Sequence, residues 1–150
     1  MAEEIRRLAR HIPNVKTLTL CGGRPMGPQL ASLKRAPHIV VGTPGRLLKH
    51  LAKQTLNVAK VQSLVLDEAD RMLGMGFIDD IDDIDDYLPQ ARQTLLFSAT
   101  FPEEIAQLSA EFQTDPVDVR IDAGESNTQI SQRFYKTDRA SRLELLLRLL

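Results

Sequence analysis

Three carboxylates within four residues follow a short apolar run and form the clearest chemical signal in the sequence. The run at residues 64–66 leads into Asp67-Glu68-Ala69-Asp70. Such a run is typical of a buried parallel strand, and open α/β sheets bind ligands at the carboxyl ends of their strands. Asp67 can therefore hold Mg²⁺, directly or through water, because Mg²⁺ takes oxygen ligands and keeps several waters. Glu68 is then free to orient or deprotonate a water for attack on phosphorus.

The same carboxylates also have a plain structural interpretation. Asp and Glu are favourable at the positive end of a helix, so the segment can equally be a solvated acidic turn that opens a helix. The spacing of these residues alone does not separate the two interpretations.

A second candidate site is the pattern Thr43-Pro44-Gly45-Arg46, which follows the apolar run 38–41. The pattern predicts a strand-to-helix junction, where free backbone N–H groups favour an oxyanion. Arg46 can add a forked, charge-assisted contact to a phosphate. Proline and glycine at a helix start also serve simple geometry, so this four-residue pattern alone is weak evidence.

Small or hydroxyl residues follow two further strand-like runs. Gly22 and Gly23 come after the alternating segment 15–20, and paired glycines let a phosphate or another backbone come close, although a simple turn is their commoner meaning. Ser98 and Thr100 come after the apolar run 93–97. Their hydroxyls can hydrogen-bond a neighbouring carboxylate and sense its ligand, or can cap the helix that follows.

The composition limits the classes of protein to which the chain can belong. The chain has 150 residues, 43% of them hydrophobic and 26% charged, as in a soluble globular domain. No apolar run approaches the roughly 18 residues of a membrane span, and no signal peptide pattern opens the sequence. The single cysteine, Cys21, allows no internal disulfide. We therefore expect a cytoplasmic protein without a membrane partner or a structural zinc site.

Charge is divided unevenly along the chain. Residues 1–60 carry 11 Lys and Arg against 2 Asp and Glu, a net charge of +9, whereas residues 61–150 carry 8 against 18, a net charge of −10. Such asymmetry favours contact between the first part and a nucleic-acid phosphate backbone.

Six aspartates crowd residues 79–86 and raise the alternative of a calcium site. The spacing lacks the glycine and glutamate of an EF-hand loop. Ile81, Ile84 and Leu88 recur at helical spacing, so we favour a helix with an apolar inner face and a solvated acidic outer face.

The remaining elements alternate between strand and helix. The helix after Arg46 is expected to bury Leu47, Leu48 and Leu51 and to expose His50. Further strands are predicted at 117–121 and 130–135, and further helices at 2–11, 29–35, 103–112 and 139–150. The polar, glycine-containing segment between the last two strands predicts a linker at 123–129.

Taken together, these motifs resemble the DEAD-box RNA helicase family, and bacterial members in particular. Asp67-Glu68-Ala69-Asp70 spells the family's Walker B motif, and the glycine pair, the Thr43–Arg46 pattern and Ser98-Ala99-Thr100 stand in the family's order around it. The resemblance implies an α/β fold with a RecA-like parallel sheet flanked by helices. It further implies ATP and Mg²⁺ as cofactors and RNA as partner, with ribosomal RNA or ribosome assembly among the expected targets.

Specific roles follow from the resemblance. Asp67 would bind the Mg²⁺ of ATP, Glu68 would activate the hydrolytic water, and Asp70, Ser98 and Thr100 would couple the nucleotide state to domain closure. The RNA sugar-phosphate backbone would be contacted, without reading of its base sequence, by Gly22, Gly23, Thr43, Pro44, Gly45 and Arg46.

The sequence also departs from the family's pattern. It contains no G-x-x-x-x-G-K-S/T phosphate loop, no Q motif, no P-T-R-E-L motif and no arginine finger of a second domain. We therefore expect an internal fragment with an incomplete sheet that lacks the N-terminal strands and the phosphate loop. Residues 1–122 would belong to the first RecA-like domain, 123–129 to a linker and 130–150 to the start of the second. The alternative is a noncatalytic RNA-binding or protein-interaction module on the same scaffold.

Overall fold

The computed structural model describes residues 1–121, 131 and 133–149. The chain divides into two compact units, Met1–Pro116 and Val117–Leu150. The first unit contains all the predicted motifs, so it positions the candidate site.

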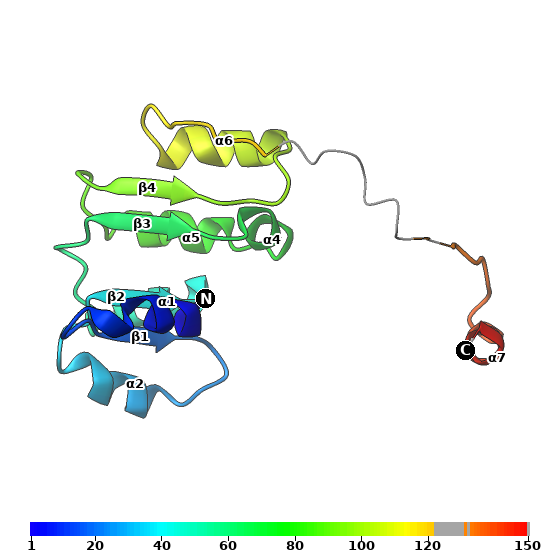
Figure 1. The fold of residues 1–150 in the computed structure, drawn as a ribbon, viewed down its shortest axis with the longest axis horizontal. Coiled ribbons are helices and arrows are strands. Elements are labelled where there is room, and N and C mark those ends of the chain that lie inside the picture. Colours follow the sequence, from blue (N-terminus) through cyan, green and yellow to red (C-terminus); the bar gives the residue numbers. More distant parts are fainter. Residues whose placement is uncertain (122–130, 132, 150) are drawn as a thin grey trace. The chain divides into compact units, whose positions relative to one another are not determined.

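Four short parallel strands form the centre of the first unit (Figure 1). They are β1 (Thr17–Leu20), β2 (Ile39–Gly42), β3 (Ser63–Leu66) and β4 (Gln93–Leu96). β1 pairs with β2 and β3 pairs with β4, both in parallel register. The predicted parallel sheet is thus present, but within the described part of the chain its strands form two two-stranded sheets instead of one.

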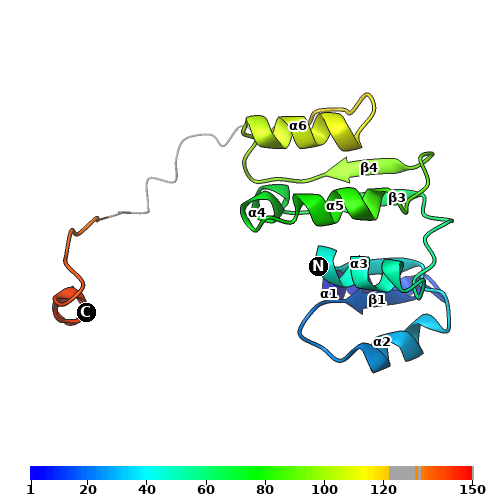
Figure 2. The same ribbon diagram turned by 180° about the vertical axis from the view of Figure 1, so that it is seen from behind.

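Helices connect and cover these strands. Their bounds are α1 (Ala2–Leu8), α2 (Met26–Leu33), α3 (Pro44–Ala52), α4 (Ala69–Gly74), α5 (Ile78–Asp85) and α6 (Glu103–Phe112), with a 3₁₀ turn at Ala9–His11. Figure 2 shows α3 and α5 together on one face of the strands. These two helices pack against each other and so link the two sheets.

The apolar interior consists of two clusters, one for each sheet. Leu66 and Ile105 belong to the first cluster, with β3, β4 and α6 around it, whereas Leu20 and Leu51 belong to the second. Helix α5 contributes Ile81 to the first cluster and Ile84 to the second. Its predicted inner face is therefore buried, and it joins the two halves of the interior.

The second unit contains one described helix, α7 (Arg142–Leu149). The strand predicted at 117–121 is wrong: Val117, Val119 and Ile121 are 88%, 81% and 92% exposed and have no strand structure. A strand needs a hydrogen-bonding neighbour, and none of the described residues supplies one. Residues 131 and 133–135 are likewise outside any strand, and the predicted linker 123–129 lies outside the described residues.

No helix in the described part of the chain combines the length and the apolar character that crossing a membrane requires.

Candidate functional site

All four predicted motifs follow the carboxyl ends of strands. The glycine pair comes after β1, Thr43 after β2, Asp67 after β3 and Ser98 after β4. β1, β3 and β4 run in the same direction in Figure 1, and β2 is parallel to β1. The fold therefore gathers four separate sequence motifs at the same edge of the first unit.

The acidic motif forms a tight turn between β3 and α4. Glu68 adopts a left-handed conformation with φ of 57°, and Ala69 behind it is fully buried. The backbone N–H of Ala69 donates to the Phe97 carbonyl at 3.0 Å, which fastens the turn to the end of β4. As a result Asp67 and Glu68 are both exposed at the strand tips.

The two exposed carboxylates have different surroundings. Glu68 forms an ion pair with Arg71, one turn further along the helix start. Within the described residues Asp67 has no hydrogen-bonding or ionic partner for its side chain. Asp67 is thus available to an external ligand, whereas Glu68 is held by a neighbouring guanidinium.

Asp70 joins the acidic motif to the hydroxyl motif after β4. Its Oδ2 accepts hydrogen bonds from the Thr100 backbone N–H at 3.1 Å and from the Thr100 hydroxyl at 2.9 Å. Its own backbone N–H donates to Ser98 Oγ at 3.2 Å. The Thr100 hydroxyl is the main reason that the pKa of Asp70 lies below its ordinary value. Asp70 is therefore an ionised connector between two loops.

The glycine pair and the Thr43 turn are also in contact. The Gly22 N–H donates to Thr43 Oγ1 at 3.3 Å, and Thr43 O accepts the N–H groups of Arg46 and Leu47 at 3.0 Å each. Gly23 has a φ of +73°, a conformation that glycine adopts without a steric penalty. Two turns thus lie side by side at the ends of β1 and β2.

Arg46 is held by a residue that the sequence did not reveal. Gln29 on α2 is 7% exposed, and its Oε1 accepts a hydrogen bond from Arg46 Nη1 at 2.9 Å. His50 Nε2 lies 2.9 Å from the same oxygen. Nothing in the spacing of Gln29 within its own helix marks it as a partner of a helix that begins 15 residues later along the chain.

The prediction that His50 faces solvent is wrong. Its side chain is fully buried, with Gln29 of α2 as one polar partner and Thr55 as a second. Burial, and then the charges of Arg46 and Lys53, lower the pKa of His50. The helical period identified Leu51 as buried but could not identify a polar neighbour from another helix.

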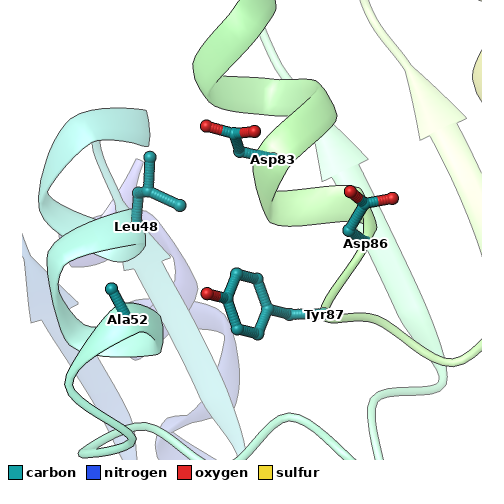
Figure 3. A pocket seen from close by; sticks show the side chains of 5 residues that line it. All are labelled: Leu48, Ala52, Asp83, Asp86 and Tyr87. Carbon is teal, nitrogen blue, oxygen red and sulfur yellow. The ribbon is translucent and has the colours of Figure 1, made fainter.

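A hollow of about 420 Å³ lies between α3 and α5, away from these motifs. It is lined by Leu48, Ala52, Asp83, Asp86 and Tyr87 (Figure 3). None of these is a predicted site residue. The described residues include no cluster of three or more His, Cys, Asp or Glu side chains arranged to hold a metal ion, which also applies to the aspartates of α5.

Comparison with known proteins gives a consistent result. The profile of the DEAD/DEAH box helicase family matches residues 1–108. The chain is 55% identical over its whole length to the ATP-dependent RNA helicase DbpA of Escherichia coli strain K12, of which it covers 33%. It is also 41% identical, again over its whole length, to the DEAD-box ATP-dependent RNA helicase CshA of Bacillus subtilis strain 168, of which it covers 30%.

Solved structures show the same relationship. A DEAD box protein from Methanococcus jannaschii matches 99% of the chain at 35% identity with a TM-score of 0.71, and the match covers 42% of that protein. A hypothetical ATP-dependent RNA helicase from Sulfolobus tokodaii matches 76% of the chain at 39% identity with a TM-score of 0.69, over 34% of its own length. The chain spans less than half the length of each of these relatives, and the fold is the expected RecA-like one. The chain belongs to the DEAD/DEAH box helicase family.

Proposed function

We propose that this chain is part of an ATP-dependent RNA helicase that couples Mg-ATP binding and hydrolysis to local unwinding of RNA. The observation that carries the proposal is the gathering of four motifs at the carboxyl ends of the strands, with Asp70 hydrogen-bonded to Thr100 between two of them. Relatives over the whole chain are named as ATP-dependent RNA helicases, which supports the same activity.

Asp67 suits a magnesium ion that is bound largely by water and phosphate. Its carboxylate is exposed at a strand tip, and it belongs to no group of three or more potential protein ligands among the described residues. Mg²⁺ usually keeps several waters and takes only one or two carboxylates beside substrate phosphates, so this donor set fits. The ion, when bound, neutralises charge on the phosphates of ATP.

Glu68 is the residue we assign to activation of the hydrolytic water. A base must come within hydrogen-bonding reach of the water whose proton it accepts. Glu68 is exposed beside Asp67; its Oε2 pairs with Arg71, which leaves Oε1 as an acceptor for a water. Because both partners are largely exposed, the ion pair is weak enough to be exchanged readily.

Asp70, Ser98 and Thr100 are suited to transmit the state of the nucleotide site. They connect the loop that carries Asp67 and Glu68 to the loop that follows β4. A shift of the first loop on binding or hydrolysis would therefore move the second. We assign these three residues to coupling, and not to the bond-breaking step.

The RNA backbone would lie over the turns after β1 and β2. The glycine pair leaves space for close approach, Thr43 offers a hydroxyl, and Arg46 offers a guanidinium for a phosphate. We assign Pro44 and Gly45 to the same contact surface as part of the turn between Thr43 and Arg46. The net charge of +9 in residues 1–60 supports contact with a polyanion. Ribosomal RNA is one target we include in the proposal, together with a cytoplasmic location.

We further propose that residues 1–122 belong to a first RecA-like domain, 123–129 to a linker and 130–150 to a second RecA-like domain. The division of the chain into compact units after Pro116 supports a boundary in this region.

The test is RNA-stimulated ATP hydrolysis by the complete protein that contains this chain. Glu68→Gln keeps the size of the side chain and removes the base, so we expect turnover to fall by about a hundredfold or more. Glu111→Gln, on the exposed surface of α6, is the matched control and should leave turnover unchanged. Undiminished turnover in Glu68→Gln would remove Glu68 from this role.

The isolated chain should hydrolyse no ATP, because it has no phosphate loop to cradle the β- and γ-phosphates. Measurable turnover by these 150 residues would contradict that expectation. If the complete protein bound RNA without nucleotide and hydrolysed no ATP, the noncatalytic module would replace the helicase as the better assignment.

A further inference from the structure

Gln29 and His50 are two buried polar residues in the described part of the chain, and Gln29 is hydrogen-bonded both to His50 and to Arg46. They come from different helices, α2 and α3. Burying a polar side chain is unfavourable unless it is hydrogen-bonded. Both side chains are hydrogen-bonded, and these bonds hold neighbouring groups in place.

The side-chain amide of Gln29 meets three groups. Its Nε2 donates to the Cys21 carbonyl at 3.2 Å, in the turn that contains the glycine pair. Its Oε1 lies 2.9 Å from Arg46 Nη1 and 2.9 Å from His50 Nε2. Since a carbonyl oxygen can only accept, both nitrogens must donate to it. Gln29 thus connects the turn after β1 to the guanidinium of Arg46 after β2.

His50 fixes the orientation of this amide. Its Nε2 must carry a proton to donate to Gln29 Oε1, and its Nδ1 lies 2.9 Å from the Thr55 hydroxyl. In the neutral imidazole Nδ1 carries a lone pair and can accept the single Thr55 hydroxyl proton, for which the His50 backbone carbonyl, 3.0 Å from the same hydroxyl, competes. Burial and the charges of Arg46 and Lys53 keep the pKa of His50 low, which favours the neutral form.

We propose that Gln29 is a positioning residue for RNA binding. It orients the Arg46 guanidinium toward the RNA backbone and fixes the position of this guanidinium relative to the turn that contains Gly22 and Gly23. The inference rests on the proposed function, in which Arg46 contacts a phosphate. An amide suits this task because it holds one N–H of the guanidinium without cancelling its charge. The remaining N–H donors and the full positive charge stay available to the phosphate.

A carboxylate in the same place would act differently. It would bind Arg46 more strongly and neutralise it, so the arginine would be well placed but weakly attractive to RNA. Gln29→Glu keeps the shape of glutamine and an acceptor for both Arg46 and His50 while it adds a negative charge. It also removes the N–H that donates to the Cys21 carbonyl. Gln29→Leu has a similar volume and removes every hydrogen bond of the amide.

The experiment measures the affinity of the complete protein for a fluorescein-labelled single-stranded oligouridine, by anisotropy, with a non-hydrolysable ATP analogue and Mg²⁺ at several salt concentrations. We expect Gln29→Leu, Gln29→Glu and Arg46→Ala each to weaken binding by about tenfold. The salt dependence should also become shallower in Gln29→Glu and Arg46→Ala, by about one charge contact. Gln107→Leu, on the exposed surface of α6, should bind as the unchanged protein does.

The decisive variant is the double substitution Gln29→Leu with Arg46→Ala. If Gln29 acts through Arg46, the double variant binds RNA as Arg46→Ala does. If Gln29→Leu weakens binding equally with and without Arg46, the residue merely supports the fold and the inference is overturned. Gln29→Glu with unchanged affinity and salt dependence would overturn it too.

Two further outcomes concern the proposed function itself. If Arg46→Ala leaves RNA affinity unchanged, both the RNA role of Arg46 and the positioning role of Gln29 are overturned. If Arg46→Ala weakens binding but both Gln29 variants bind normally, the proposed RNA surface stands and the inference alone fails.

Discussion

At the scale of single residues, the chemistry depends on side chains whose ionisation and orientation are set by hydrogen bonds to neighbouring residues. Asp70 stays ionised because the Thr100 hydroxyl and backbone N–H groups donate to it. Gln29 Oε1 accepts from Arg46 and from His50, so loss of Gln29 leaves the buried Nε2–H of His50 without its acceptor, at a cost of about 1–3 kcal/mol. Thr100 and Arg46 are thus held by the ionised Asp70 and the buried Gln29, respectively.

The buried histidine makes stability depend on pH. The pKa of His50 in the folded protein lies below its ordinary value of 6.5, so the unfolded chain takes up a proton first as the pH falls. The stabilising contribution of neutral His50 is therefore present above pH 6.5 and is lost as the pH falls below that value. We expect the thermal midpoint of the complete protein to decrease over this range.

The His50→Gln variant should show a smaller decrease, because glutamine can donate to Gln29 and does not titrate. His11→Gln, at an exposed position, is the control. Equal pH dependence of the midpoint in the unchanged protein and in His50→Gln would contradict the assignment.

At the scale of elements, turns and helix ends decide where the site residues lie. The turn after β1 needs a left-handed residue at Gly23, and helix α5 needs an anchor at its carboxyl end. That anchor is Arg92, whose side chain is 5% exposed and which pairs with Asp85 and donates to the Pro89 carbonyl at 2.9 Å. These contacts link α5 to the start of β4, the strand that leads to Ser98.

Gly23 and its neighbour offer a matched pair of substitutions. An added Cβ meets nothing within 4 Å at Gly22 or at Gly23, but only Gly23 has a positive φ, of +73°. Gly23→Ala should therefore lower the free energy of unfolding by about 1–2 kcal/mol, through backbone strain alone. Gly22→Ala should lower the free energy of unfolding by a clearly smaller amount. Urea denaturation of the complete protein compares them, and equal losses would argue against a left-handed turn.

The Asp85–Arg92 ion pair should contribute strongly to stability. Asp85→Ala leaves the buried guanidinium without its counter-charge, which we expect to cost about 3 kcal/mol. Asp83→Ala makes the same substitution at an exposed position of the same helix and should stay within about 0.5 kcal/mol. Urea denaturation followed by circular dichroism measures both, and similar effects would show that the pair is not a structural anchor.

At the scale of the whole molecule, the first unit consists of two small sheets joined mainly by packing between α3 and α5. Each strand has at most one hydrogen-bonded neighbour within the described residues. Unpaired strand edges invite association with other chains. In the second unit, Leu143 and Leu147 of α7 are both 67% exposed, which adds uncovered apolar surface.

The isolated chain should therefore be marginally stable or aggregate. Sedimentation should detect species larger than a monomer, and calorimetry should show a broad or irreversible transition. The complete protein is the control and should sediment as a defined species. A monomeric isolated chain that melts cooperatively and reversibly would contradict this prediction.

Sequence patterns predicted much of the local structure, for physical reasons that act locally. Helix α6 begins and ends at the predicted residues, because its apolar positions repeat at helical spacing after Pro102. Ile81 and Ile84 are buried as expected. Residues 117–121 have an equally strand-like alternation but no neighbouring strand, so the pattern alone did not produce one.

The sequence by itself determined the family and the strand ends that carry the motifs, because motif order and apolar runs are properties of a linear chain. Tertiary structure alone decided which side chains meet. It buried His50 against Gln29, joined Gln29 to Arg46 and joined Asp70 to Thr100. It also separated β2 from β3. Hydrogen-bond partners and strand neighbours come from segments far apart in the chain, and local periodicity contains no information about which segments pack together.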